Sequence, residues 1–351
     1  MTMTTAAIDT AEDRKGSRVP SKPGAPLLEL KDLTMHFTVK GEGLLRRANN
    51  KVQAVDGVSL TVGPGETLGL VGESGCGKST TARLIARLLT PTSGQILYQG
   101  HDIAHLSDRQ LLPYRREIQL IFQDPYSSLN PRHTVGTIVG TALRTHNMVP
   151  KGRELARVQE LLEVVGLNPE HYNRYPHEFS GGQRQRIGIA RALAARPKVI
   201  VADEPVSALD VSIQAQVMNL LEDLRKEFNI AFVFIAHDLG VVRHFCDRVA
   251  VMYLGRVMEM GPREQIYAAP QHPYTQALLS AVPDVNVARG AEPRTRIRLS
   301  GDVPSPIDPP SGCRFRTRCW KAEDICAEVT PPLEEKAGGQ LAACHFAEPQ
   351  V

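Results

Sequence analysis

The stretch GESGCGKS, residues 72–79, decides the fold, because it matches the pattern G-x-x-x-x-G-K-[ST] of a phosphate-binding loop. It follows the apolar run ETLGLV and precedes KSTTARLIARLL, which has helical spacing, so the motif has the strand, loop and helix context that it requires. The alternative, a glycine turn with a chance lysine, does not account for that context. The residues expected to contact a nucleotide are Gly72, Glu73, Ser74, Gly75, Cys76, Gly77, Lys78, Ser79 and Thr80.

Phosphate chemistry explains these residue types. Glycines let the backbone curl so that successive N–H groups point at the phosphates, and the N-terminus of the following helix adds its positive end. We expect Lys78 to place its charge on the β- and γ-phosphate oxygens, and Ser79 to offer its hydroxyl to Mg²⁺. The motif predicts a P-loop enzyme that binds a nucleoside triphosphate, which leaves several classes of such enzymes open.

A pair of carboxylates supplies the second half of the predicted site. VIVADE, residues 199–204, is a short apolar run that ends in Asp203 and Glu204. Asp203 is placed to hold Mg²⁺ through its water shell, and Glu204 is placed to polarise the attacking water as general base. The alternative is a solvated strand end, but two carboxylates closing a buried strand would be a costly arrangement without such a role.

Apolar patterns around these motifs predict an α/β fold. KVIVAD and AFVFIAH are nearly continuous in apolar residues and are separated by the helical SIQAQVMNLLEDLRKEF, as in a parallel sheet covered on both faces. LLELKDLTMHFTV and VQAVDGVSLTV alternate at period two, which predicts an antiparallel β subdomain, with a loop over GEGLLRRANN between the two strands. Residues 128–180 predict an inserted helical subdomain, in which residues 158, 161, 162 and 165 form one apolar stripe.

FSGGQ, residues 179–183, narrows the class of P-loop enzyme. Followed by the helical RQRIGIARALAARP and then by the Asp203 strand, it resembles the signature motif of ABC ATPases, with Phe179 at the first position. It is a second anion-binding helix start, which one chain does not need for one nucleotide. The resemblance implies a head-to-tail dimer with a second ATP-binding subunit, in which the signature faces the partner's ATP through Ser180, Gly181, Gly182 and Gln183.

Further motifs occur in the order of the ABC family. Gln123 matches the Q-loop glutamine, which in the family contacts Mg²⁺ and water where the transmembrane subunits dock, and His237 matches the switch histidine that binds the γ-phosphate. Phe37 lies where family members place an aromatic that stacks on adenine, although an aromatic in a strand is more often part of the core. The D-loop is matched by Ser207, Ala208, Leu209 and Asp210. The resemblance implies catalysis by Glu204, His237 and Gln123, and Mg²⁺ held through Ser79, Gln123 and Asp203.

The C-terminal part resembles the extension of ATP-binding subunits of oligopeptide and dipeptide importers. This resemblance rests on four segments: QHPYT, residues 271–275; GCRFRTRC, residues 312–319; the loop over residues 41–50; and the sequence FSGGQRQRIGIARAL. The resemblance implies that the chain hydrolyses ATP to energise peptide import, beneath two transmembrane permease subunits fed by an extracytoplasmic peptide-binding protein. An importer for another substrate, such as nickel or glutathione, and a non-transport ABC ATPase are the alternatives.

Four of the six cysteines gather in the last part of the chain, where Pro-rich GDVPSPIDPPSG precedes them. Their gaps do not fit the short pairs of zinc ribbons, whereas all-thiolate ligation suits a 4Fe-4S cluster of the kind reported for some relatives. Zinc and an unligated or disulfide-bonded state are the alternatives. Three neighbouring arginines, Arg314, Arg316 and Arg318, could offset the negative charge of such a centre. The expected cluster ligands are Cys313, Cys319, Cys326 and Cys344.

Composition and charge set the remaining expectations. The net charge is only +3 and the basic residues are scattered, so nothing favours a nucleic-acid partner. No secretory signal is recognisable and no apolar stretch reaches the ~18 residues of a membrane span, so we expect a peripheral protein at the cytoplasmic face of the membrane. We expect a disordered tail over residues 1–26, an ABC nucleotide-binding domain over 27–262 and the C-terminal extension over 263–351.

Overall fold

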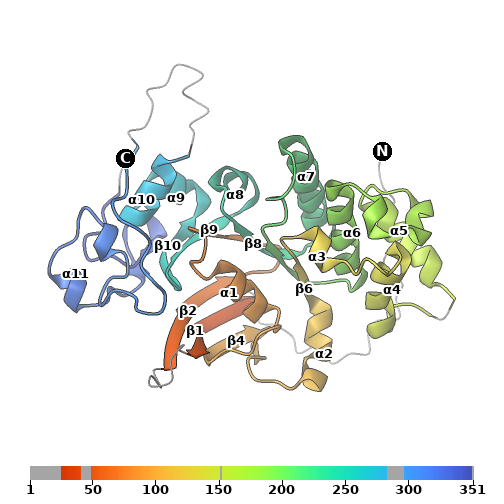
Figure 1. Cartoon of the computed structure of the whole chain (residues 1–351), viewed down its shortest axis with the longest axis horizontal. Helices are drawn as coiled ribbons and strands as arrows, with labels where there is room; N and C mark the ends of the chain where they lie inside the picture. The colour runs from red at the N-terminus through yellow and green to blue at the C-terminus, as the bar shows by residue number, and fades with distance from the viewer. Residues whose placement is uncertain (1–24, 41–48, 151, 283–295, 350–351) are drawn as a thin grey trace, which may run out of the picture.

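The computed structural model describes residues 25–40, 49–150, 152–282 and 296–349. The predicted disordered tail lies outside these residues up to residue 24. The predicted loop over residues 41–50 lies outside them at residues 41–48, and its last two residues, Asn49 and Asn50, belong to a strand. The described parts form two sheets with helices around them, with the antiparallel sheet, the helical insertion and the C-terminal extension arranged about the central sheet (Figure 1).

The smaller sheet is antiparallel, with four strands in the order β2-β1-β4-β5 among the described residues. Its strands are β1 (Leu28–Lys40), β2 (Asn49–Val62), β4 (Ser93–Tyr98) and β5 (His101–Asp102). Successive side chains of a strand point to opposite faces, so Leu28 and Leu30 are buried while Lys31 is exposed. The two antiparallel strands predicted from alternation are confirmed.

The central sheet has eight strands in the described part of the chain, in the order β11-β12-β10-β9-β3-β8-β7-β6. Its parallel strands are β3 (Thr67–Val71), β6 (Ile118–Ile121), β7 (Val199–Asp203), β8 (Ala231–Ala236) and β9 (Arg248–Tyr253). Every residue of β3, β7 and β8 is buried, as expected for strands covered on both faces. The predicted site residues follow the carboxyl ends of these strands: the phosphate-binding loop follows β3, and Glu204 follows β7.

Helices follow three of the parallel strands along the chain, as the α/β prediction required: α1 (Lys78–Ile85) after β3, α7 (Val211–Phe228) after β7 and α8 (Leu239–Phe245) after β8. Helix α2 (Asp108–Glu117) precedes β6. Helix α1 contacts β7 and β8, so the helix that begins at Lys78 is fixed against the strand that ends at Asp203. The two halves of the predicted phosphate site are thus brought together by the packing of one helix on one sheet.

The helical insertion lies at the opposite end of the molecule from the C-terminal extension (Figure 1). It contains α3 (Pro125–Ser128), α4 (Val135–Thr145), α5 (Glu154–Val164), the 3₁₀ turns η2 (Pro169–Asn173) and η3 (Pro176–Glu178), and the start of α6 (Gly181–Ala194). The stripe predicted on α5 is confirmed, because the residues at positions 158, 161, 162 and 165 are all buried. Helices α4, α5 and α6 pack on one another through such apolar faces.

The C-terminal part follows β10 (Arg256–Pro262), which pairs antiparallel with β9. Its elements are α9 (Arg263–Ala268), α10 (Pro273–Ser280), η5 (Arg316–Arg318), α11 (Ile325–Glu328), β11 (Glu334–Glu335), η6 (Ala337–Gly339) and β12 (Leu341–Ala342). Strand β12 pairs with β10, so the extension adds two short strands to the edge of the central sheet. Its buried Tyr274 and Phe315 belong to the same apolar cluster as Tyr253 of β9.

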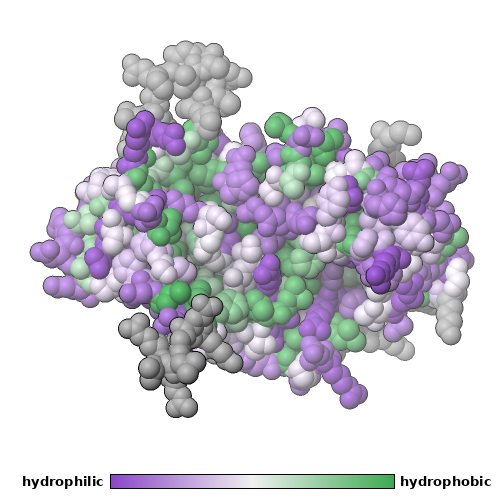
Figure 2. All heavy atoms as spheres, in the orientation of Figure 1, coloured by the Kyte–Doolittle hydropathy of each residue, from purple (hydrophilic) through white to green (hydrophobic). Residues whose placement is uncertain are grey.

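Among the described residues, no helix is long and apolar enough to cross a membrane. On the face drawn in Figure 2, hydrophobic patches alternate with hydrophilic residues.

Candidate nucleotide-binding and hydrolysis site

The phosphate-binding loop joins β3 to α1, and its glycines are required by close backbone contacts. A Cβ atom on Gly72, which has φ 150°, would lie 2.1 Å from the carbonyl oxygen of Met252. A Cβ atom on Gly77, which has φ 107°, would lie 2.1 Å from the carbonyl oxygen of Ala54. No larger residue fits at either position, so the loop can curl around an anion only with these glycines.

Lys78 and Ser79, the first two residues of α1, are the polar side chains predicted to bind phosphate and Mg²⁺. The buried Lys78 donates from Nζ to the carbonyl oxygens of Gly72 at 2.7 Å and Glu73 at 2.9 Å, so it lies folded back across the loop. Ser79 donates from Oγ to Oδ1 of Asp203 at 3.0 Å. These oxygens are hard donors of the kind that Mg²⁺ takes, and burial raises the pKa of Asp203. The pair therefore fits the predicted magnesium site.

A cavity of about 210 Å³ opens above the loop. The predicted residues that line it are Ser74, Gly75, Gly77, Lys78, Ser79, Thr80, Gln123 and Glu204. Three lining residues were missed by sequence reasoning, namely Val52 and Ala54 of β2 and Pro306. No local signal distinguishes them, because Pro306 belongs to the Pro-rich stretch before the cysteines, and Val52 and Ala54 lie in an alternating strand. Phe37 is half-buried on β1 opposite Val52, one strand away from the lining residues.

The candidate catalytic residues converge on one carboxylate oxygen. Oε2 of Glu204 accepts a hydrogen bond from Nε2 of Gln123 at 2.9 Å and lies 3.1 Å from Nδ1 of His237. Glu204 has φ 45°, a left-handed conformation that a residue with a side chain adopts only when its surroundings hold it there. Its N–H donates to the carbonyl oxygen of Ile235 on β8, which fixes this turn. The sequence motifs from three separate loops thus meet at the end of β7.

The signature begins α6 with a capping box. Ser180 accepts from the N–H of Gln183 at 3.4 Å, and Oε1 of Gln183 accepts from the N–H of Ser180 at 3.0 Å. Phe179 is buried and packs edge-on against His171, so an aromatic fills this apolar position. A Cβ atom on Gly182 would lie 2.4 Å from Ile213 at the start of α7. The exposed Ser180 is therefore held at the N-terminus of α6.

The D-loop lies between the catalytic carboxylate and α7. Ser207 donates from Oγ to the carbonyl oxygen of Glu204 at 3.1 Å, Ala208 and Asp210 are exposed, and Leu209 lies 3.5 Å from the position of a Cβ on Gly181. Among the described residues that line the nucleotide cavity, none comes from the signature or the D-loop. Within one chain, therefore, the signature does not contribute to the cavity above the phosphate-binding loop.

The four C-terminal cysteines lie near one another without forming disulfides. Burial raises the pKa of Cys313 to about 11, and the other three cysteines are close enough to add to this shift. Among the described residues, however, no group of three or more His, Cys, Asp or Glu side chains is arranged to hold a metal ion. The expected 4Fe-4S or zinc site is therefore not seen in this arrangement.

The neighbouring arginines have partners other than the cysteines. Arg314 binds Asp56 and the carbonyl oxygen of Leu254, and Arg318 binds Glu73. Only Arg316 remains within the extension, donating to Ser311. Arg314 and Arg318 are thus paired with carboxylates of the nucleotide-binding part, and their expected role beside a metal centre stays a prediction.

The fold and the site define an ATPase of the ABC class, with a phosphate-binding loop, a carboxylate pair and a signature helix on one α/β frame. The profile of a family described as "ABC transporter" matches residues 55–207, and that of a family described as "Oligopeptide/dipeptide transporter, C-terminal region" matches residues 258–326. The chain therefore belongs to the ATP-binding proteins of ABC transporters that carry the oligopeptide/dipeptide transporter C-terminal region.

Similar proteins agree with this assignment. The oligopeptide transport ATP-binding protein AppF of Bacillus subtilis (strain 168) is 55% identical, over 91% of this chain and 97% of the relative. The putative oligopeptide transport ATP-binding protein YkfD of the same organism is 52% identical, over 92% and 95%. Among solved structures, the ATP-binding cassette MJ0796, a dimer in a post-hydrolysis state bound to ADP and Pi, superposes with a TM-score of 0.60 at 31% identity, over 67% of this chain and 98% of the cassette.

Proposed function

We propose that this chain hydrolyses ATP to energise the import of oligopeptides or dipeptides, as one of two ATP-binding subunits on the cytoplasmic face of a membrane. The observation that carries the proposal is the meeting of Gln123 and His237 at Glu204, beside the cavity above the phosphate-binding loop. The C-terminal region supports the substrate class, because AppF and YkfD, which are similar along most of the chain, are named for oligopeptide transport.

In the proposed reaction, Glu204 takes a proton from the water that attacks the γ-phosphorus of ATP. Lys78 and His237 stabilise the negative charge that develops on the γ-phosphoryl oxygens. Ser79, Asp203 and Gln123 would hold Mg²⁺, which would supply positive charge to the phosphate oxygens. Gln123 and His237 both contact Oε2 of Glu204, so the two residues hold the proposed base at the end of β7.

The second ATP-binding subunit completes the site. The signature is not among the residues that line the cavity of its own chain, and the start of a helix such as α6 is a favourable place for an anion. In a head-to-tail dimer, Ser180 and Gly182 of one subunit would face the γ-phosphate held by the other, and the dimeric form of MJ0796 with ADP and Pi supports this arrangement. Closure on ATP and reopening after product release would drive two permease subunits, which receive peptide from an extracytoplasmic binding protein.

Glu204→Gln tests the catalytic part of the proposal. Removing the general base is expected to lower the rate of ATP hydrolysis by roughly 10²–10⁴-fold while ATP binding remains, because the phosphate-binding loop is unchanged. The matched control is Glu227→Gln, an exposed glutamate of α7, which should leave hydrolysis unchanged. Phosphate release and equilibrium ATP binding are measured on the same preparations. Sustained turnover in Glu204→Gln would assign the base to another residue.

The substrate class needs a transport measurement. The chain is reconstituted with the permease subunits that co-purify from membranes, and ATP hydrolysis is measured with oligopeptide, dipeptide, nickel or glutathione and the matching binding protein. Stimulation by peptides supports the proposal, and stimulation by nickel or glutathione alone redirects it. Co-purification with ribosomes or DNA and no permease would instead favour a non-transport ABC ATPase.

We also propose that Cys313, Cys319, Cys326 and Cys344 hold a structural 4Fe-4S cluster. The support is the donor set, four neighbouring thiols free of disulfides, which is the ligand type of such clusters. Anaerobic purification should give a brown protein with iron and acid-labile sulfide in equal amounts, both lost in Cys319→Ser. A colourless, iron-free protein with zinc would assign these thiols to zinc.

A further inference from the structure

Glu73 belongs to the phosphate-binding loop, but it makes its contacts with the C-terminal extension. Its carboxylate accepts two hydrogen bonds from Arg318, at 2.7 Å from Nη1 and 3.2 Å from Nη2. Its backbone N–H donates to the hydroxyl of Tyr274 at 2.9 Å. Glu73 is not among the residues that line the nucleotide cavity. Both the side chain and the backbone of this loop residue are thus held by residues that lie more than two hundred positions further along the chain.

The two residues that hold Glu73 are themselves rigidly packed. Tyr274 is fully buried in α10, with its ring 4.7 Å from that of Tyr253 and 5.3 Å from that of Phe315. The Arg318 side chain is 9% exposed and ends the 3₁₀ turn η5, directly before Cys319. A bidentate arginine–carboxylate pair in such surroundings is stronger and more directional than an exposed ion pair.

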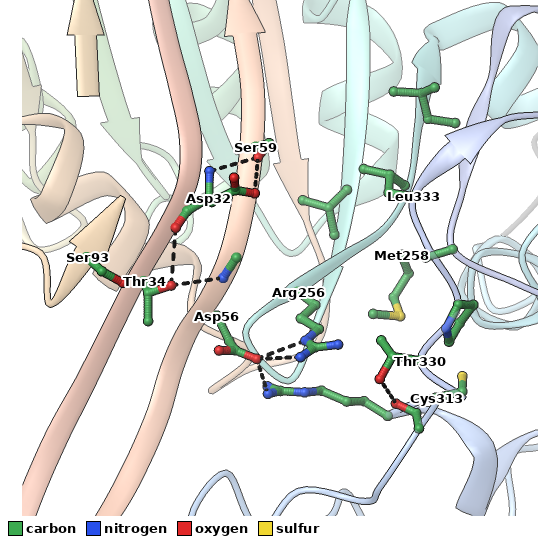
Figure 3. Close-up of a pocket in the computed structure, with 17 residues that line it drawn as sticks. Asp32, Thr34, Asp56, Ser59, Ser93, Arg256, Met258, Cys313, Thr330 and Leu333 are labelled. Carbon is green, nitrogen blue, oxygen red and sulfur yellow. Dashed lines mark hydrogen bonds and ion pairs between the residues drawn. The ribbon is translucent and has the colours of Figure 1, made fainter. Parts of the chain in front are cut away.

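A second contact docks the same segment at another point. Arg314 shares Asp56 with Arg256, at the junction of β2, β10 and the extension (Figure 3). This contact lies next to the antiparallel sheet and includes no residue of the phosphate-binding loop. The extension is therefore fixed to the nucleotide-binding part by Arg314, while Arg318 reaches the loop itself.

The carbonyl oxygens of Gly72 and Glu73 hold the Lys78 ammonium, so a shift of residue 73 would move the acceptors of the lysine that meets the phosphates. A loop already held in its binding conformation loses less conformational freedom when its ligand arrives. We propose that Arg318, together with Tyr274, is a positioning residue that holds the phosphate-binding loop through Glu73 and so raises its affinity for ATP. The inference rests on ATP binding at this loop and is independent of the transported substrate.

The test compares three variants of the full-length chain. Arg318→Ala should raise the Kd and the KM for ATP by about five- to tenfold, the loss that corresponds to the net contribution of one typical hydrogen bond, with kcat within about twofold. Arg318→Lys should restore part of the affinity, because a lysine offers a point charge without the two-pronged geometry. Arg316→Ala is the matched control and should leave Kd and KM unchanged.

A double-mutant cycle separates positioning from general stability. In a Glu73→Gln background, Arg318→Ala should have little further effect on the Kd for ATP, because the pair is already broken. Tyr274→Phe, which removes only the hydroxyl, should raise Kd in the same direction. The inference would be overturned if the effects of the Arg318 and Glu73 substitutions on Kd were independent of each other. It would also be overturned if Arg318→Ala lowered kcat and the melting temperature while KM stayed unchanged. If hydrolysis is absent even in the unmodified chain, the catalytic proposal fails while the Kd values still decide this one.

Discussion

His272 shows how strongly its surroundings set the chemistry of one side chain. It begins α10, where Nδ1 accepts from the N–H of Tyr274 at 3.0 Å, and it is 1% exposed. Burial disfavours the charged imidazolium and lowers the pKa of His272 to about 3. The sequence shows this histidine only as part of QHPYT, since burial depends on the packing of α10 and β12 against β10.

This residue predicts a pH dependence of stability. The unfolded chain binds a proton at His272 below its ordinary pKa near 6.5 and the folded chain does not, so stability falls as the pH falls. Between pH 7 and 5 this loss is on the order of 2 kcal/mol. Glu259, which accepts from the N–H of His272, has a pKa raised by burial and contributes with the opposite sign.

The measurement is therefore a difference between two proteins. Denaturant unfolding of the unmodified chain and of His272→Asn is followed at pH 7 and pH 5, since asparagine keeps the helix cap but does not titrate in this range. The variant should lose less stability on acidification than the unmodified chain. Equal losses in the two proteins would show that His272 is not the group responsible.

Elements that carry local motifs were the most predictable part of the molecule. The strand before Gly72, the strand that ends at Asp203 and the stripe on α5 follow from short-range patterns and were confirmed. The contacts of Pro306 and Arg318 could not be predicted in this way, because no periodicity links residues such as Arg318 and Glu73, which are 245 positions apart. Proline and arginine are also common on protein surfaces, so neither residue type indicates by itself that these positions make such contacts.

The start of α6 allows a prediction that separates its structural role from its proposed role toward the partner's ATP. Ser180→Asp keeps the helix cap, because aspartate is as good a cap as serine, but places a negative charge where a phosphate would lie. Hydrolysis should fall at least about tenfold below that of Ser180→Asn, which caps without the charge. Melting temperature and ATP binding by the isolated chain should remain unchanged in both. Equal hydrolysis in the two variants would contradict a role in phosphate contact.

At the scale of the whole molecule, the extension and the nucleotide-binding part share one packed interior. Phe315 contacts Tyr253 of β9 and Tyr274 of α10, with ring centroids 5.4 Å and 5.3 Å apart. Strand β12 belongs to the same sheet as β3, the strand that leads into the phosphate-binding loop. An extension joined in this way is expected to unfold together with the rest of the described structure.

The single tryptophan of the sequence, Trp320, lies in the extension, so its fluorescence reports the unfolding of this part of the chain. Its fluorescence and the far-UV circular dichroism of the whole chain should change at the same denaturant concentration. Phe315→Ala should lower the free energy of unfolding by about 3–5 kcal/mol and shift both signals together. A fluorescence transition that precedes the change in circular dichroism would instead show that the extension unfolds by itself.

The two short strands β11 and β12, at the edge of the central sheet, also affect the tendency of this chain to aggregate through that edge. Without them, β10 would present a seven-residue edge of unpaired backbone groups, the kind of surface on which strands from other chains stack into aggregates. Strand β12 covers part of that edge, and the outermost strand, β11, is only two exposed glutamates long. Brevity and negative charge make this rim a poor template for strand addition, so the extension lowers the tendency of this edge to pair with another chain.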